Sequence, residues 1–301
     1  SFTGVVGFKP TYGMVPTEGV VPLSPSNDHV GVLADEVETA ATVLEAVAGR
    51  EATRPDSQTA PTRLSFVEDL DRSPPRLRLG LVSEFMEAAA PTVEAEIEAA
   101  LTACVSELDA EIGAVTFPEA EAAVDANDVQ TVVEFAALLE RGHLLGTGQR
   151  AGLRAALRRA NRKTDSLPYR VAALVEAGRE LHDRAPDAYG RTWDARRLAI
   201  RRQQALFGEV DVLATPTTTL PAPAFGAVPG DDGPTVLDTV ENTAPFNATG
   251  APAVSIPCGE VEGRPVGLQL VGPPGADGYL LRVAASVERA LSQPSQSTNT
   301  A

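Results

Sequence analysis

The sequence predicts an α/β protein whose sheet is mixed, mainly parallel, and covered by helices on both faces. Three observations support this class. The run Val5–Phe8 is apolar on both sides and therefore needs a layer of structure on each face. Residues 77–117 read strand, helix, strand, the pattern of a βαβ unit with a right-handed crossover. Strands alternate with helices near both ends of the chain, which favours a helix-covered sheet.

The opening strand is followed by a long loop and a helix. Pro10 ends the strand, because proline has no N–H to donate to a sheet. Residues 11–31 are rich in proline and glycine and should lie near the surface or over a site. Asp35 is positioned to cap a helix that runs to Ala48. A buried strand at the first residues leads us to expect a chain that begins inside a domain.

The βαβ unit is the clearest local pattern. Residues 50–63 are polar and are expected to form a linker or an exposed crossover before a strand at Leu77–Val82. Pro91 opens a helix, which Gly113 ends, and Val115–Phe117 forms the next strand. The apolar positions of this helix recur at the helical period: Val93, Ile97, Ala100, Leu101, Cys104, Leu108 and Ile112.

Residues 119–208 are expected to be mainly helical. The predicted helices are Val129–Leu145, Gln149–Arg162, Leu167–Arg184 and Ala188–Phe207. The last of them carries a cluster of four arginines, Arg196, Arg197, Arg201 and Arg202. Such a cluster is typical of a DNA-binding helix or of a solvated face that pairs with acidic neighbours. The acidity of the chain favours the solvated face.

The C-terminal part returns to strands. The predicted strands are Val210–Ala214, Ala253–Pro257 and Val266–Val271, with a turn at Glu262 and Gly263 between the last two. Short and closing helices are expected at Thr235–Asn242 and Tyr279–Leu291. We expect one domain over residues 1–291, followed by a disordered polar tail over residues 292–301.

Composition excludes several classes of partner. The net charge of −16 argues against nucleic acid and anionic membranes, which require clustered lysine and arginine. No apolar run reaches the ~18 residues of a membrane helix. Lys9 and Lys163 are the two lysines among 25 basic residues, against 41 acidic ones. This balance fits an acidic, halophilic surface or a codon bias, and we favour salt adaptation.

Metal, disulfide and nucleotide chemistry are not indicated. Cys104 and Cys258 are expected to be buried free thiols, which suits a reducing, cytoplasmic setting. The three histidines show no metal-binding spacing, and His29 is expected to hold its loop by hydrogen bonds. No glycine-rich phosphate motif follows a strand, so we expect no cofactor.

Three separated segments carry a resemblance to a known family. At the N-terminus they are GVVGFKPT (4–11), GVVP (19–22) and the spacing Ser26-x-Asp28-x-x-Gly31. At the far end they are VLATPT (212–217), PFNATGAPAVSIPCG (245–259) and PVGLQLVG (265–272). These motifs resemble the amidase signature family, over residues 1–50 and 205–291. The middle of the chain matches the family only in the order of its predicted helices and strands.

The resemblance implies a hydrolase that cleaves a carboxylic amide to an acid plus ammonia or an amine. In that family a serine attacks the carbonyl, and a neutral lysine acts as base through a bridging cis-serine. The positions that match this triad lie upstream of Ser1, so no catalytic residue is assigned here and the chain alone is expected to be inactive. Candidate substrate-cleft residues are Asp28, Pro216, Thr217, Phe246 and Asn247.

Lys9 invites a different assignment. A desolvated lysine can be neutral near pH 7 and serve as a base in a Ser–Lys pair. However, Lys9 matches a family position that is not the catalytic lysine. We therefore favour a structural role, such as binding carbonyls or a carboxylate.

Two alternatives to an amidase remain. The first is the amidase-like subunit of a glutamyl-tRNA(Gln) amidotransferase, although VENT (240–243) stands where an Asp-x-Phe-Thr segment is common in that subfamily. The second is a non-catalytic remnant that binds a partner. A small-molecule amide is the expected ligand, and a homodimer is left open.

Overall fold

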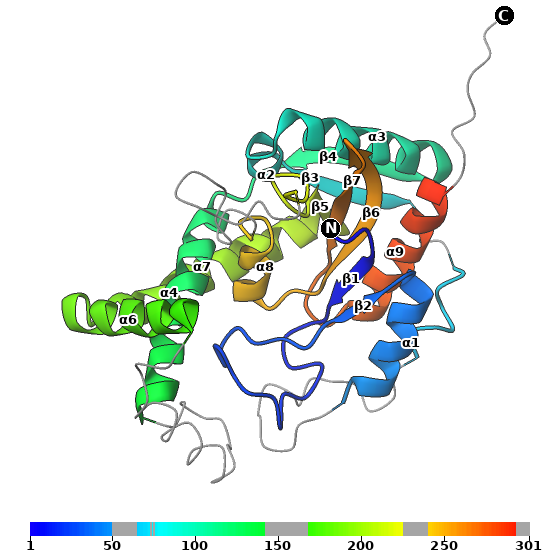
Figure 1. The fold of residues 1–301 in the computed structure, drawn as a ribbon. Helices are drawn as coiled ribbons and strands as arrows, with labels where there is room; N and C mark the ends of the chain where they lie inside the picture. Colours follow the sequence, from blue (N-terminus) through cyan, green and yellow to red (C-terminus); the bar gives the residue numbers. More distant parts are fainter. Residues whose placement is uncertain (50–64, 73, 75, 142–167, 225–239, 293–301) are drawn as a thin grey trace, which may run out of the picture.

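The computed structural model describes residues 1–49, 65–72, 74, 76–141, 168–224 and 240–292. Within these ranges one seven-stranded sheet has the order β2-β1-β6-β7-β5-β3-β4 (Figure 1). Its strands are β1 (Val6–Lys9), β2 (Val32–Ala34), β3 (Leu77–Val82), β4 (Ala110–Val115), β5 (Val212–Pro216), β6 (Ala253–Val261) and β7 (Arg264–Val271). The first strand of the chain is therefore an interior strand, as its apolar composition predicts.

The mixed sheet is confirmed, but its expected mainly parallel character is wrong. In the described sheet, β3 pairs in parallel with β4 and β5, while the other four neighbouring pairs are antiparallel. One of these four antiparallel pairs has a local cause. The turn at Glu262 and Gly263, both with positive φ, joins β6 and β7 as a tight hairpin. A short hairpin can only make antiparallel strands.

Helices cover both faces of the sheet. They are α1 (Val37–Val47), α2 (Ser83–Glu87), α3 (Pro91–Glu107), α4 (Glu119–Arg141), α6 (Tyr169–Arg184), α7 (Ala188–Glu209), α8 (Ala244–Thr249) and α9 (Asp277–Ser292). The predicted 149–162 helix and the 292–301 tail lie outside the described residues, apart from Ser292, which ends α9. The expected linker at 50–63 and most of the 235–242 helix also lie outside them.

Strand alternation sends side chains to two different cores. Phe8, Val254, Leu268, Leu270 and Ala214 point to the face that α1, α3 and α9 cover. Leu213, Val271 and Ala253 point the other way, toward a second core with α2, α4, α7 and α8. Figure 1 shows α4, α6 and α7 extending from the sheet on this second side.

The βαβ unit is confirmed with shifted boundaries. The helix ends at Glu107, and β4 already begins at Ala110, where Leu77 pairs with it in register. Leu108 is extended and caps the helix by donating its N–H to the Cys104 carbonyl. The helical spacing of apolar residues continues beyond the end of the helix, to Ile112, by coincidence. Parallel pairing with β3 satisfies the backbone groups from residue 110 onward, and this overrides the helical period.

Four other elements differ from expectation. Helix α4 begins at Glu119, ten residues before the predicted start, because its alanine-rich first turns give little apolar periodicity. Helix α8 lies at 244–249 and ends at Gly250, whose φ of 71° suits glycine. The three-residue strand β2 was not predicted. The N-cap residue of helix α1 is Glu36, which makes no side-chain cap, so the expected capping by Asp35 is wrong.

The arginine cluster of α7 does not form one solvated face. Arg197 pairs with Asp194 at the surface, as expected. Arg202 donates to the carbonyl of Thr116. Arg196 is instead buried, and its Nη1 donates to the Ser26 carbonyl and to Gln130 Oε1, both at 3.1 Å. The expectation that all four arginines are solvated is thus wrong for Arg196.

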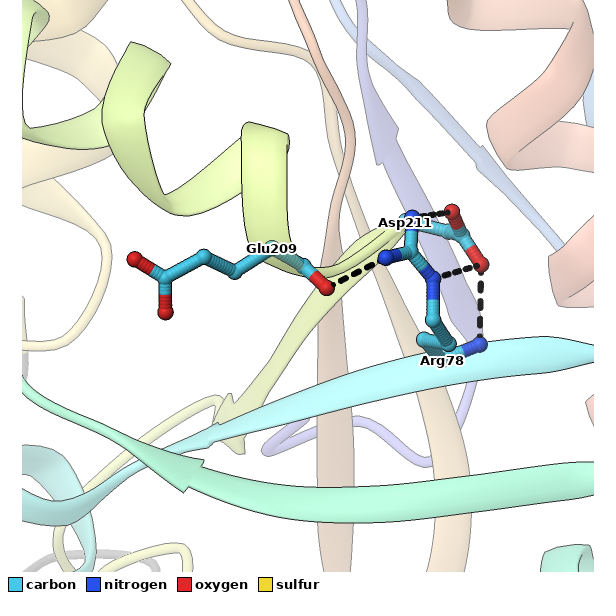
Figure 2. Close-up of polar contacts among 3 residues, drawn as sticks. All are labelled: Arg78, Glu209 and Asp211. Atoms are coloured by element: carbon cyan, nitrogen blue, oxygen red, sulfur yellow. Dashed lines mark hydrogen bonds and ion pairs between the residues drawn. The ribbon is translucent and has the colours of Figure 1, made fainter.

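The start of β5 is tied to β3 by one arginine (Figure 2). Arg78 donates Nη2 to Asp211 Oδ1 at 2.6 Å and Nη1 to the Glu209 carbonyl at 2.6 Å. The backbone N–H of Arg78 also reaches Asp211 Oδ2. The guanidinium holds the pKa of Asp211 below its usual range. This pair connects the end of α7 and the start of β5 to β3.

Candidate functional site

A row of small and polar residues crosses four strands on one face of the sheet. Gly7 of β1 pairs with Ser255 of β6, Ser255 with Gln269 of β7, and Gln269 with Thr215 of β5. Directly paired residues of neighbouring strands share a face. Their neighbours along each strand point into the opposite, apolar core. The sheet is therefore amphipathic here, and its polar patch belongs to neither of the two apolar cores that the described residues form.

A cleft of about 390 Å³ lies over this row. Its lining comes from β1, β2, β6 and β7, from the residues just before β2 and just after β5, and from the residue before α8: Gly7, Phe8, Lys9, Gly31, Val32, Leu33, Thr217, Thr243, Ala253, Ser255 and Gln269. Leu33 is 79% exposed at its rim. The walls are largely apolar and the floor is polar. This is the arrangement of a site for a small organic molecule that carries a few hydrogen-bonding groups.

Two hydroxyl groups of the floor bind each other. Thr217 Oγ1 and Ser255 Oγ are 2.7 Å apart. Gly267 lies beneath them, and a Cβ at that position would stand 2.6 Å from Ser255 Oγ and 3.0 Å from Thr217 Oγ1. The glycine therefore makes the room in which the pair forms.

Gln269 is the third polar group of the floor and is 3% exposed. Its Nε2 donates to Thr215 Oγ1 and to the Asn242 carbonyl, each at 2.8 Å. Asn242 in turn donates Nδ2 to the Pro216 carbonyl at 3.0 Å. Strands β5 and β7 and the segment before α8 are thus held in one buried hydrogen-bond network.

Lys9 has the structural role that we favoured. Its Nζ donates to the carbonyls of Ala251 and Pro10. Burial of the ammonium lowers the pKa of Lys9 to about 7, and the charge of Asp277 opposes this shift. Asp277 is 1% exposed and accepts from Thr11 N at 2.7 Å and Thr11 Oγ1 at 2.5 Å. Lys9 and Asp277 hold the end of β1 against the segments at 251 and 277.

The loop before β2 is held by a buried carboxylate. Glu134 of α4 accepts from Ser24 Oγ, from the Ser26 N–H and from Tyr189 OH. Asp28 accepts from the N–H groups of Leu23 and Ser24, both at 3.0 Å, and so shapes the loop locally. His29 Nδ1 lies 2.6 Å from the Asn27 carbonyl, which confirms the expected loop-holding role.

The structure separates the five sequence candidates. Thr217 lines the cleft, and Pro216 precedes it at the end of β5. Phe246 is fully buried between Phe85 and Phe117, with ring centroids at 5.7 and 6.2 Å. Asn247 donates to Asn127 Oδ1 of α4 at 3.2 Å. Asp28 belongs to the loop described above. Their contact with substrate stays a prediction.

Sequence reasoning missed three polar lining residues, namely Thr243, Ser255 and Gln269. A signal was present in PVGLQLVG, where a glutamine interrupts an otherwise apolar strand. A lone polar residue in a buried strand predicts a hydrogen-bonded network or a site on that face. That Ser255 lies opposite this glutamine depends on strand pairing and could not be read locally.

Other chemistry is not supported in the described part of the chain. Its acidic, histidine and cysteine side chains form no cluster of three that could hold a metal ion. None of its helices combines the length and apolarity needed to cross a membrane. Burial raises the pKa of Cys104 to about 11 and of Cys258 to about 12, so both thiols stay protonated at neutral pH. Cys104 is buried as expected, and Cys258 is half-buried.

Comparison with known proteins gives a consistent result. The family described as Amidase matches residues 1–281. A glutamyl-tRNA(Gln) amidotransferase subunit from Symbiobacterium thermophilum is 35% identical, over 96% of this chain and 60% of its own length. The subunit of the same name from Thermus thermophilus is also 35% identical, over 97% of this chain and 62% of its own. The chain thus spans about three fifths of the curated relatives it matches.

Solved structures show the same fold. The structure of 6-aminohexanoate cyclic dimer hydrolase matches with a TM-score of 0.77 and 25% identity, over 97% of this chain and 62% of that one. The glutamyl-tRNA(Gln) amidotransferase subunit from Thermotoga maritima matches with a TM-score of 0.73 and 25% identity. That match covers 96% of this chain and 58% of the other.

Proposed function

The chain belongs to the amidase signature family, and from this membership we propose that it is the cleft-bearing part of an amidase. The reaction is hydrolysis of a carboxylic amide. A serine oxygen attacks the carbonyl carbon, the C–N bond breaks, and the nitrogen leaves as ammonia or an amine after taking a proton. Water then cleaves the acyl-serine ester and releases the acid. No cofactor takes part.

The observation that carries this proposal is the cleft over the polar row. Ser255, Thr217 and Gln269 supply hydrogen-bonding groups on a rigid sheet, while the walls are apolar. An uncharged amide with an apolar body fits such a lining, because its C=O and N–H need partners and its remainder needs none. The described residues contain no group of three acidic, histidine or cysteine side chains that could hold a metal ion.

We assign the nucleophile to sequence ahead of Ser1. The hydroxyls on the cleft floor bind each other, and the Lys9 amine is held by carbonyl oxygens. The 301 residues alone are therefore expected not to hydrolyse amides. Among the sequence candidates, Thr217 is proposed to contact the substrate and Pro216 to position it. Asn247, Phe246 and Asp28 are proposed to support the cleft walls.

The test compares this chain with the polypeptide extended by the codons upstream of Ser1. Ammonia release from benzamide is expected from the extended polypeptide and not from the 301 residues. Replacing the upstream nucleophilic serine by alanine is the matched control and should abolish release. Hydrolysis by the 301 residues, lost in Lys9→Met, would overturn our placement of the nucleophile. The amidase proposal would be overturned if an extended chain with an intact triad hydrolysed none of a range of small amides.

A second candidate is the amidase-like subunit of a glutamyl-tRNA(Gln) amidotransferase. It is favoured by one observation, namely that the 35% identical relatives are named as subunits of that enzyme. The residues at 240–243 speak against it, because VENT lacks the acidic residue expected there at the start of the motif. Co-purification of the extended polypeptide with a second protein, and release of ammonia from glutamine in its presence, would favour this candidate. A monomer that hydrolyses simple amides would exclude it.

We also propose that the protein is adapted to high salt and works in the cytoplasm, as a monomer or a homodimer. The excess of 41 acidic over 25 basic residues fits a protein adapted to high salt, where screening removes self-repulsion. Two free cysteines fit a reducing cytoplasm. The expected measurement is a melting temperature that rises steadily with potassium chloride concentration. Light scattering of the same samples decides between monomer and homodimer.

A further inference from the structure

The side-chain amide of Gln269 has one orientation only. One atom of the amide faces the Asn242 carbonyl at 2.8 Å, and a carbonyl oxygen only accepts hydrogen bonds. That atom must therefore be Nε2. Its second hydrogen goes to Thr215 Oγ1, whose own hydrogen is donated to the Pro216 carbonyl at 3.0 Å. Both donors of the amide are thereby used in the protein.

The Oε1 oxygen of the same amide can accept a hydrogen bond from a molecule in the cleft. Gln269 lines the cleft, and no hydrogen bond to its Oε1 is formed within the described residues. Both side-chain amide atoms of Gln203 on α7 are buried from solvent and have no hydrogen-bond partner. Gln269 Oε1 is not buried in this way. Gln269 therefore presents a fixed hydrogen-bond acceptor to whatever enters.

A hydrogen-bond donor lies beside this acceptor. Thr217 and Ser255 share one hydrogen bond, so one of their two hydroxyl hydrogens is used and the other is available. Ser255 pairs directly with Gln269 across β6 and β7, on the same face. The cleft floor thus carries a donor and an acceptor side by side. A carboxamide carries the complementary pair, a C=O that accepts and an N–H that donates.

We propose that Gln269 is a specificity-determining residue whose Oε1 accepts the N–H of a bound amide, while the Thr217–Ser255 pair donates to its carbonyl oxygen. The site then selects primary and secondary amides over esters, ketones and tertiary amides. An analogue without the N–H leaves a largely buried acceptor unpaired, which is the strongest way for a site to reject a ligand of the same shape. This selection rests on the proposed amidase function.

The test measures binding to the 301-residue chain by chemical-shift titration, so it needs no hydrolysis. Benzamide and acetophenone have nearly the same shape and differ in NH₂ against CH₃. Benzamide is expected to bind about tenfold more tightly, the equivalent of one hydrogen bond. Gln269→Met should remove this preference. Gln203→Met, the same change at an equally buried glutamine of α7, should leave it intact.

Ser255→Ala provides an independent arm, because both ligands carry a carbonyl. It should weaken benzamide and acetophenone by the same factor and preserve their ratio. Equal binding of the two ligands to the unchanged chain, or binding of neither, overturns the proposal even when Gln269→Met fails to fold. Ammonia release by the extended polypeptide in that case shows that the selection fails while the amidase function stands.

Discussion

The two faces of the sheet are built from the same strands, but one face is mainly apolar and the other carries polar groups. On one face, α1, α3 and α9 cover a continuous apolar core that includes Leu268 and Leu270. On the other, a second apolar core packs against α2, α4, α7 and α8, and beside it lies the row Gly7, Ser255, Gln269. The first face stabilises the fold by burial, and the second presents groups that need partners. Neighbouring residues of one strand therefore have unrelated roles.

Leu268→Ala is the largest expected disruption, because it opens a cavity in the covered face. Leu268 is fully buried, and such truncations cost about 2–5 kcal/mol in the free energy of unfolding. On the cleft face, Ser255→Ala removes one hydrogen bond and should cost about 1 kcal/mol. Urea denaturation of both variants measures the contrast. Equal losses would mean that the two faces contribute alike to stability.

Gly267→Ala should come second, because it forces a methyl group into the hydroxyl pair. The new Cβ would lie 2.6 Å from Ser255 Oγ, and overpacking of this kind costs about 1–3 kcal/mol. Gly113→Ala is the control, since the space beside Gly113 of β4 is open. Urea denaturation should show a clear loss for the first variant and almost none for the second. An unchanged free energy of unfolding for Gly267→Ala would mean that the Thr217–Ser255 pair can move aside without loss of stability.

Lys9 makes the stability of the cleft face depend on pH. Because the pKa of Lys9 falls from 10.5 to about 7 on folding, the unfolded chain holds more protons at this site between these values. The free energy of unfolding should therefore rise with pH through this window. The useful range is pH 7 to 8.5, since the cysteine thiols of the unfolded chain ionise near their ordinary pKa of 9.0 and act in the opposite direction.

Lys9→Met is the variant that isolates this effect. Urea midpoints measured from pH 7 to 8.5 should rise more steeply for the unchanged chain than for Lys9→Met, because methionine does not titrate. The N-terminal amine, whose pKa is also lowered by burial, contributes equally to both proteins and cancels. Parallel curves would show that Lys9 keeps its proton in the folded state.

Asp211→Asn is the smallest expected change. The pair with Arg78 lies outside both cores, half-exposed, and such contacts contribute little to stability. We expect a slight fall in the melting temperature that shrinks further as salt is added. A loss comparable to that of Gly267→Ala would show that the pairing of β3 with β5 depends on this arginine.

The sequence alone determined the fold class, the βαβ unit and the interior position of the first strand. These follow from local rules, since apolar runs, helical periods and proline or glycine stops act over a few residues. The structural role of Lys9 and the loop role of His29 were also within its reach, because both rest on the residue type and its place at a strand end or in a turn.

Only the tertiary structure decided which polar residues meet. Ser255 and Gln269 lie fourteen positions apart and become neighbours through the β6–β7 hairpin, while Thr217 reaches them from β5. The same long-range pairing made the sheet mostly antiparallel and ended α3 before Ile112. Strand pairing couples residues across the chain, so its outcome depends on the whole sheet and is not written in any one segment.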